Sequence, residues 1–181
     1  MKQLYFLAIL PPSEISRQID SFRKKILPHV KPKEEHKKFP HVTLQHTFRR
    51  EPEIEKVFEE KLSVHARGID PFSVSTNGIG HFDKSVIYIS VMPNPDLETL
   101  YGNVREFLLK EMQFREEETA KEYKPHITLE KKLSKPEFSE HWENIKLMSL
   151  PLAFPVRSFS LMKHNGRSWD ELKRFHLHKS A

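Results

Sequence analysis

One short motif, proline-histidine-aliphatic-threonine-leucine, occurs twice in the sequence, at residues 40–44 and again at residues 125–129. The proline before each histidine favours extended backbone, and the residues after it are good strand formers. Side chains two positions apart on a strand point to the same face. We therefore expect each motif to present one imidazole and one hydroxyl together on a polar face, with aliphatic side chains on the face beneath.

Two histidines in one site can divide the work of acid–base catalysis. A neutral imidazole accepts a proton from a nucleophile while a second, protonated imidazole donates one to a leaving oxygen. This division suits phosphodiester cleavage, and neighbouring threonine hydroxyls can donate hydrogen bonds to the phosphoryl oxygens. The candidate catalytic residues are His41 and His126, and Thr43 and Thr128 are candidate substrate-binding residues. The scheme requires no metal ion or other cofactor.

The motif is part of a larger repeat. An apolar run ending at Pro11 precedes the first motif, and a similar run ending at Pro93 precedes the second. The two prolines are 82 positions apart and the two histidines 85, so the offset is kept within three residues. A single motif of this kind is more often a structural feature of an exposed strand, whereas a duplicated unit carries its symmetry into a shared site. The repeat therefore favours a function for both motifs.

Each copy is typical of a strand, a helix, a loop and a second strand. The two opening apolar runs are rich in β-branched and aromatic residues and end at proline. Ser13 and Asp96 are candidate N-caps of helices whose apolar residues recur at helical spacing. These helices are predicted to end near Pro28 and near Met112.

The remaining elements lie between and after the two copies. Apolar periodicity predicts two further helices, and runs of good strand formers predict further strands. The dipeptide Asn165-Gly166 is a strong signal for a tight turn and indicates a closing hairpin. The predicted ranges are a helix at 53–66, a strand at 72–79, a helix at 136–147 and hairpin strands at 154–162 and 169–177.

The composition narrows the class of protein. The chain has 181 residues, enough to bury a core, and no cysteine, which excludes disulfide bonds and thiolate metal sites and fits a reducing cytoplasm. The apolar run at residues 4–10 lacks a small-residue cleavage site and is too short to span a bilayer, so we expect a cytoplasmic protein with no membrane partner. Lys and Arg number 30 against 25 Asp and Glu, and this mildly basic, well-mixed charge favours anionic partners without selecting among them.

The paired motifs in a duplicated unit of this size resemble those of the 2H phosphoesterases, most of all the 2′-5′ RNA ligase and RNA 2′,3′-cyclic phosphodiesterase family. The similarity covers nearly the whole chain. It implies an α+β, bilobal, duplicated fold in which two antiparallel β-sheets line a central cleft and helices lie on the outside. It also implies a single domain, residues 1–181, made of two pseudo-symmetric lobes with repeat units at about 3–47 and 85–132.

The resemblance further implies metal-independent hydrolysis of 2′,3′-cyclic phosphate ends of RNA or nucleotides to 2′-phosphates, without a cofactor. In such a reaction His126 would activate water and His41 would protonate the leaving oxygen. The implied partners are RNA ends or nucleotides that carry a cyclic phosphate, and the implied state is a monomer. 2′-5′ RNA ligase activity, the reverse reaction, is left open.

The chain departs from the family pattern just after each motif. Many members carry an arginine after the second motif, where this chain has Lys131, which we expect to bind phosphate as a point charge without a bidentate fork. Glu130 beside it is expected to weaken anion binding. After the first motif, Gln45 and His46 replace small and aromatic residues, which indicates a different substrate preference. On a regular strand His46 would face away from His41 and have a structural role.

Other residues near the motifs or the chain end are given structural roles. His176 and His178 offer only two ligands for a metal ion in an exposed tail. Tyr123 and Phe39 could stack on a base, but packing against the cleft wall is the more frequent role for such rings.

Two other functions stay open at the level of the sequence. The cleft could bind an RNA or nucleotide end as a regulatory module with little turnover. The same pair of histidines could also act on another phosphodiester, such as a 2′-5′ linked oligonucleotide or a cyclic sugar phosphate. Turnover of a simple cyclic nucleotide would distinguish the hydrolase from the binding module. Competition between substrates would distinguish a hydrolase of 2′,3′-cyclic phosphates from a hydrolase of another phosphodiester.

Overall fold

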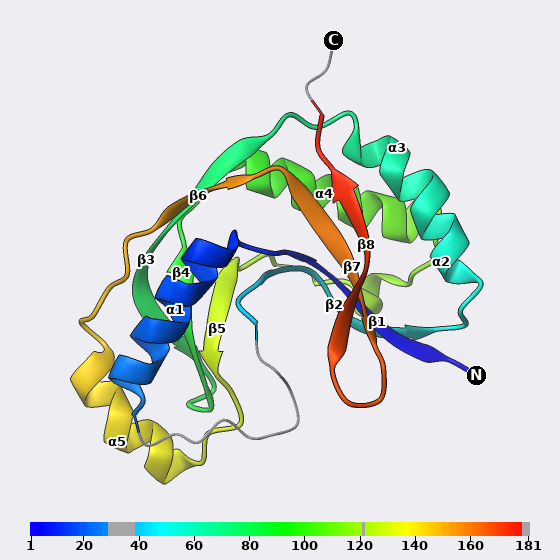
Figure 1. Ribbon diagram of the computed structural model, residues 1–181. Coiled ribbons are helices and arrows are strands. Elements are labelled where there is room, and N and C mark those ends of the chain that lie inside the picture. The colour runs from blue at the N-terminus through cyan, green and yellow to red at the C-terminus, as the bar shows by residue number, and fades with distance from the viewer. Residues whose placement is uncertain (29–38, 121, 179–181) are drawn as a thin grey trace.

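The computed structural model describes residues 1–28, 39–120 and 122–178. Within these residues the chain forms one curved, antiparallel, eight-stranded sheet with helices packed along it (Figure 1). The strands are β1 (Gln3–Ile9), β2 (Val42–Arg50), β3 (Phe72–Phe82), β4 (Val86–Val91), β5 (His126–Glu130), β6 (Ala153–Val156), β7 (Ser158–His164) and β8 (Trp169–His176). The helices are α1 (Ser13–Ile26), α2 (Ile54–Val57), α3 (Ser63–Ala66), α4 (Pro95–Lys110) and α5 (Lys135–Ile145), with a π-helical turn, η1 (Phe58–Leu62), and a 3₁₀ turn, η2 (Glu116–Glu118).

The strand order divides the sheet into two equal halves. It runs β6-β3-β4-β5-β2-β1-β7-β8, so that β5 and β2 lie in the middle and each half contains four strands. A single residue pair, Val42 with Ile127, joins the halves, whereas neighbouring strands within a half pair along several residues. The predicted α+β fold with two antiparallel sheets is therefore confirmed, and the two sheets meet edge to edge in one curved surface.

The repeated unit is visible in the order of elements. β1, α1 and β2 correspond to β4, α4 and β5, and in each copy the two strands are adjacent and antiparallel. Both predicted N-caps are wrong. α1 follows Pro12 and starts at Ser13 without a side-chain cap. α4 is capped by Asn94, whose Oδ1 accepts a hydrogen bond from the Leu97 N–H at 2.9 Å. Asp96 lies inside the first turn, where its charge still favours the helix N-terminus.

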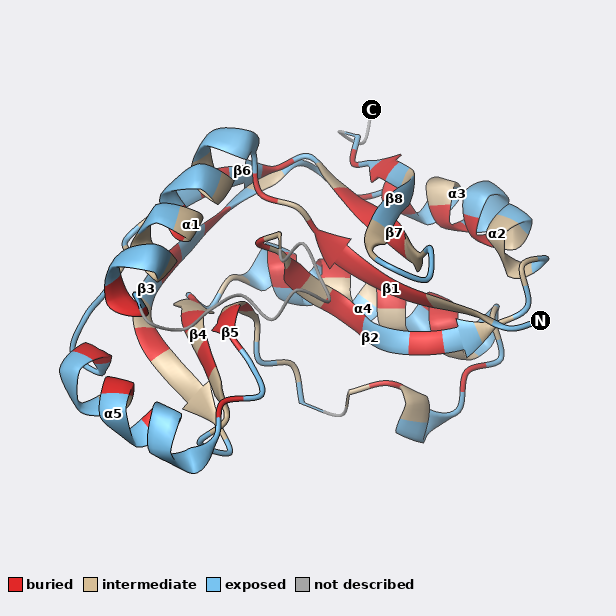
Figure 2. Ribbon diagram, turned by 60° about the horizontal axis from the view of Figure 1, so that its bottom comes forward, coloured by how far each residue is buried: buried red, intermediate tan, exposed pale blue. Residues whose placement is uncertain are grey.

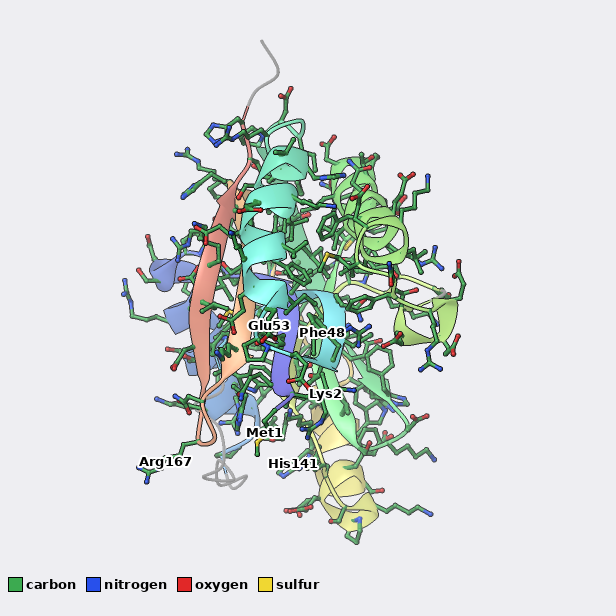
Figure 3. All side chains as sticks on the ribbon, turned by 90° about the vertical axis from the view of Figure 1, so that its right-hand side faces the viewer. Met1, Lys2, Phe48, Glu53, His141 and Arg167 are labelled. Atoms are coloured by element: carbon green, nitrogen blue, oxygen red, sulfur yellow. The ribbon has the colours of Figure 1, made fainter. Side chains whose placement is uncertain are left out.

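The elements outside the repeat follow the prediction with one correction. The helix expected at 53–66 is present as α2, η1 and α3 in direct succession. The strand expected at 154–162 is interrupted at Arg157, because β6 pairs with β3 in one half and β7 pairs with β1 in the other. The chain thus crosses between the halves at this residue. The hairpin β7–β8 turns at Gly166, which has a φ of +97°, and Arg167 points away from its tip (Figure 3).

The main core lies between the sheet and the helices. Tyr5, Leu7 and Ile9 of β1 belong to it, and α4 contacts β2 and β3. The buried residues of the helices face the sheet, and their exposed residues face away from it (Figure 2). On the opposite face of β1, Phe6 and Ala8 form a second, smaller cluster with Met162. This second face of the central strands carries the two motifs.

No helix in the described part of the chain is long and apolar enough to cross a membrane.

Candidate active site

The pairing at the centre of the sheet brings the two motifs together. Val42 and Ile127 are opposite each other in antiparallel strands, and both side chains are fully buried. Their neighbours on either side must therefore point to the other face, where His41 and Thr43 meet the histidine and threonine of the second motif. The aliphatic residues of the motifs fix the register, and the register places the polar residues in one site.

All five residues expected in the site line one pocket of about 240 Å³. Its other lining residues are aromatic or polar side chains from outside the expected set. The complete lining is Phe6, Phe39, His41, Thr43, His46, Thr47, His126, Thr128, Lys131 and Trp169. Across residues 1–28, 39–120 and 122–178, no cluster of three or more histidine, aspartate or glutamate side chains is arranged to hold a metal ion.

Both histidines are held by the same backbone contact. The Nδ1 of His41 lies 2.9 Å from the carbonyl oxygen of Phe39, and the Nδ1 of His126 lies 2.7 Å from that of Lys124. A carbonyl oxygen can only accept a hydrogen bond, so each Nδ1 must carry a proton and donate it. When the imidazole is neutral, Nε2 is therefore left as an acceptor, and when it is protonated, Nε2 becomes a donor. Both histidines can thus act as base or as acid through Nε2.

Aromatic rings flank each histidine in an equivalent way. The ring centroid of His41 lies 5.2 Å from that of Phe6 and 5.3 Å from that of Phe39. The centroid of the second histidine ring lies 5.1 Å from that of Tyr88 and 4.9 Å from that of Phe82. Phe6 and Tyr88 are 82 positions apart in the sequence, the same offset as the two prolines, but Tyr88 pairs with Thr128 whereas Thr43 pairs with Ala8. The contacts of Phe6, Tyr88 and Phe82 with the histidines were not predicted, although the offset between the two prolines also relates Phe6 to Tyr88.

A glycine makes room for one of these rings. Gly80 on β3 lies directly opposite Tyr88 on β4. A Cβ atom at position 80 would lie 2.5 Å from three atoms of the tyrosine side chain. The absence of a side chain at Gly80 therefore allows Tyr88 to lie close to its partner strand while its ring packs against His126.

Burial shifts the acid–base properties of both histidines in the same direction. The pKa of His41 is lowered mainly by burial; its hydrogen bond to a carbonyl opposes this, and the charges of His126 and Lys131 add to the lowering. The pKa of His126 is also lowered mainly by burial, with a further contribution from the charge of His46. Both imidazoles are therefore biased towards the neutral form, and an anion bound between them would favour protonation.

Lys131 reaches the pocket from a well-anchored position at the end of β5. Its backbone N–H donates to Glu130 at 3.0 Å. Glu130 is buried and forms an ion pair with Arg23 of α1, which also donates to the Leu129 carbonyl at 2.9 Å. The reason for expecting Glu130 to weaken anion binding does not hold, because its carboxylate is buried and neutralised by a guanidinium; the effect on anion binding stays a prediction.

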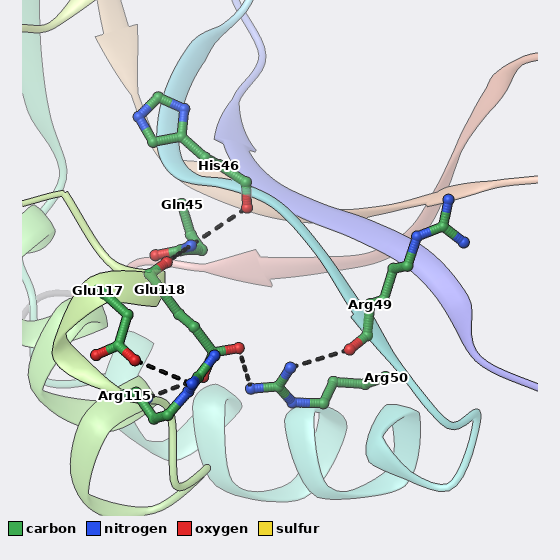
Figure 4. Close-up of polar contacts among 7 residues, drawn as sticks. All are labelled: Gln45, His46, Arg49, Arg50, Arg115, Glu117 and Glu118. Carbon is green, nitrogen blue, oxygen red and sulfur yellow. Dashed lines mark hydrogen bonds and ion pairs between the residues drawn. The ribbon is translucent and has the colours of Figure 1, made fainter.

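His46 lies in the pocket, so the expectation that it faces away from His41 is wrong. The pairing of β2 with β1 slips twice, once on each side of Gln45, which indicates β-bulges in β2. Extra residues in a strand break the strict alternation of faces. Gln45 is consequently buried and donates to the Glu118 carbonyl at 2.8 Å, while the His46 ring is exposed and points to the other side of the strand (Figure 4).

A second pocket of about 220 Å³ adjoins the first and shares Thr43, His46 and His126 with it. Tyr123 lines this second pocket and stacks on Tyr101 with ring centroids 3.9 Å apart. Its packing role is the one expected from the sequence, whereas Phe39 lines the first pocket directly. His176 and His178 have ring centroids 6.5 Å apart at the end of β8, away from both pockets.

The curved antiparallel sheet with a histidine–threonine strand from each half at its centre is the fold of the 2H phosphoesterases. A model of the 2′-5′ RNA ligase superfamily matches residues 11–168, and the chain belongs to that family. Among curated relatives, an Oceanobacillus iheyensis protein named "putative phosphoesterase" is 28% identical over 178 residues, which cover 96% of this chain and 97% of the relative. A Bacillus cytotoxicus protein with the same description is 25% identical over 181 residues, which cover 97% of each chain.

Solved structures agree with this assignment of the fold. A crystal structure of E. coli LigT superposes with a TM-score of 0.72 at 23% identity and covers 99% of each chain. A Thermus thermophilus protein superposes with a TM-score of 0.66 at 25% identity, covering 98% of this chain and all of the other. The chain is therefore similar to these proteins along its whole length.

Proposed function

We propose that the protein is a metal-independent phosphodiesterase that hydrolyses 2′,3′-cyclic phosphate ends of RNA or nucleotides to 2′-phosphates by acid–base catalysis with His41 and His126. One observation carries the proposal. Both histidines have Nδ1 fixed as a donor to a carbonyl, which leaves each Nε2 as the reactive atom at one shared pocket. General acid and base catalysis by a positioned pair is the chemistry that such an arrangement supports.

In the proposed reaction, Nε2 of neutral His126 takes a proton from water as the water oxygen forms a bond to phosphorus. The bond from phosphorus to the 3′-oxygen breaks, and Nε2–H of protonated His41 donates its proton to that oxygen. The phosphate remains attached to the 2′-oxygen. One proton enters the histidine pair and one leaves it, so the pair is restored when the two histidines exchange protons with solvent. This division of roles is the one that the family resemblance implies.

The other pocket residues stabilise charge on the phosphate. The hydroxyls of Thr43 and Thr128 flank the histidines and can donate to the non-bridging oxygens. The ammonium of Lys131 adds a positive charge on the side of His41. Because the bound phosphate is an anion, it offsets that charge and raises the pKa of the histidine that must act as the acid.

Two features support a nucleotide as the substrate class. The pocket is lined by a cluster of aromatic rings, Phe6, Phe39 and Trp169, on which a base can stack. E. coli LigT, which shares the fold, has been solved in complex with 3′-AMP. We further propose that the chain is one domain of two pseudo-symmetric lobes, with repeat units at about 3–47 and 85–132, because each lobe supplies one half of the site.

The product isomer tests this proposal. The purified protein would be incubated with adenosine 2′,3′-cyclic phosphate in EDTA, and the products would be identified by phosphorus NMR. The proposed chemistry predicts turnover with the 2′-phosphate as product. A 3′-phosphate product would contradict the proposed geometry. Binding without turnover would favour a regulatory module, or a different phosphodiester such as a 2′-5′ linked oligonucleotide or a cyclic sugar phosphate.

A further inference from the structure

His46 and Lys131 occupy equivalent places in the two copies of the repeat. His46 lies five residues after His41, and Lys131 lies five residues after His126. Both side chains line the pocket between the histidines. We propose that His46 is a third functional histidine, which binds the reacting phosphate when it is protonated and makes substrate affinity depend on pH. This inference rests on the proposed phosphodiesterase function.

β-bulges in β2 place the side chain of His46 at the pocket. The bulges around Gln45 turn the glutamine into the protein interior and leave the next residue on the pocket face. The Gln45 amide is held by the carbonyls of Glu118 at 2.8 Å and of His46 itself at 3.3 Å. Bulges often redirect a side chain next to an active site. The backbone that carries His46 is therefore held in place, and the exposed His46 ring lines the pocket.

A charged residue of each copy affects the pKa of the histidine in the other copy. Lys131, from the second copy, is the cation whose charge reaches His41 in the first. His46, from the first copy, is the group whose charge reaches His126 in the second. The pKa of each candidate catalytic histidine is thus affected by the charge of the residue that follows the other one. The first pocket is therefore lined by a lysine from the second copy, Lys131, and by a histidine from the first, His46.

The surroundings of His46 suit an anion. Lys124 lies 3.4 Å from Glu122, so this nearby carboxylate is already paired with an ammonium group. The remaining titratable residues that line the two pockets are histidines, tyrosines and a lysine. The titratable and charged groups that line the two pockets with His46 are His41, His126, Lys131, Tyr101, Glu122, Tyr123 and Lys124.

The expected effect has a definite sign. An imidazole is largely protonated at about pH 5.5 and largely neutral at about pH 8. A cyclic phosphate diester keeps one negative charge across this range, so a change in its affinity reports on the protein. Affinity should be high while His46 is charged and should fall as the pH rises. Loss of one charge-assisted hydrogen bond corresponds to about a tenfold change in KM.

The test compares KM and kcat for adenosine 2′,3′-cyclic phosphate at both pH values in four proteins: wild type, His46→Gln, His46→Lys and His176→Gln. His176 is an exposed histidine of β8 that lines neither pocket and serves as the matched control. We expect His46→Gln to raise KM about tenfold at about pH 5.5 and by a smaller factor at about pH 8, with a lesser effect on kcat. The His46→Lys variant should keep a low KM at the higher pH, because its charge persists there. The control should follow the wild type.

Equal KM values for wild type and His46→Gln at both pH values would overturn the inference. A failure of His46→Lys to lower KM at the higher pH would also overturn it. If the wild type does not turn over the cyclic nucleotide, the proposed function fails, and the same comparison is made on Kd by calorimetry. The same pH pattern in Kd then supports His46 as the anion-binding residue, and its absence overturns that role.

Discussion

Replacement of Gly80 by alanine should displace the Tyr88 ring and, through it, the imidazole of His126. The new Cβ would lie 2.5 Å from atoms of the Tyr88 ring, whereas carbon atoms in contact prefer about 3.5 Å or more. The tyrosine ring must therefore move by about 1 Å. Because this ring packs against His126, the movement is transmitted to the imidazole.

The size of the effect follows from this displacement. A misplacement of about 1 Å in a catalytic group can cost about 10²-fold in rate. The atoms that must move are the far end of a partly exposed side chain, so the cost in stability should be at or below the low end of the about 1–3 kcal/mol seen for overpacked cores. We expect Gly80→Ala to lower kcat/KM for a cyclic nucleotide by about 10²-fold while the protein remains folded.

The assay measures kcat/KM together with thermal unfolding, and Gly78→Ala is its control. Gly78 lies on the same strand, two residues away, and a Cβ there meets nothing within 4 Å. The control should keep its activity. If Gly80→Ala is as active as Gly78→Ala, the ring of Tyr88 does not position His126, and the reasoning is refuted.

Three further results are expected from substitutions around the site. Arg23→Ala removes the guanidinium that neutralises the buried carboxylate of Glu130, so the free energy of unfolding by urea should fall by about 3–5 kcal/mol. A loss no larger than that of Glu130→Gln would contradict this. Lys131→Ala should raise KM and Lys131→Arg should restore or lower it, because a guanidinium also binds phosphate; steady-state kinetics at fixed ionic strength decide this. The pKa of His41 is lowered in the folded protein, so the unfolded chain binds the proton first as the pH falls. Stability should therefore be full above about pH 6.5 and decline below it, and this decline should be smaller in His41→Gln when urea unfolding is measured across the range.

Much of the fold could be predicted because the relevant signals are local or repeated. Proline before the histidines, strand-forming residues after them and an almost constant offset between the two copies define the central strands and their polar face. Because Val42 and Ile127 are buried on one face of the sheet, the histidines and threonines of the two motifs must lie on the other face. The helix at 53–66 and the closing turn at Gly166 have similarly clear local patterns.

Apart from the two helix N-caps, the features that the sequence did not reveal depend on long-range pairing. The bulges that turn His46 into the pocket arise from the register of β2 against β1, which alternation within β2 cannot reveal. The break at Arg157 exists because the flanking residues pair with strands from different halves of the sheet. The ion pair that neutralises Glu130 comes from Arg23, more than a hundred positions away in the sequence.

The most direct test of the central claim is kcat/KM for a 2′,3′-cyclic nucleotide in EDTA with His41→Ala, His126→Ala and the double variant. The two-histidine mechanism predicts that each single variant loses about 10²–10⁴-fold while its thermal unfolding stays close to that of the wild type. The double variant should lose less than the product of the two, because the residues act as a unit. Full activity in either single variant would contradict the mechanism.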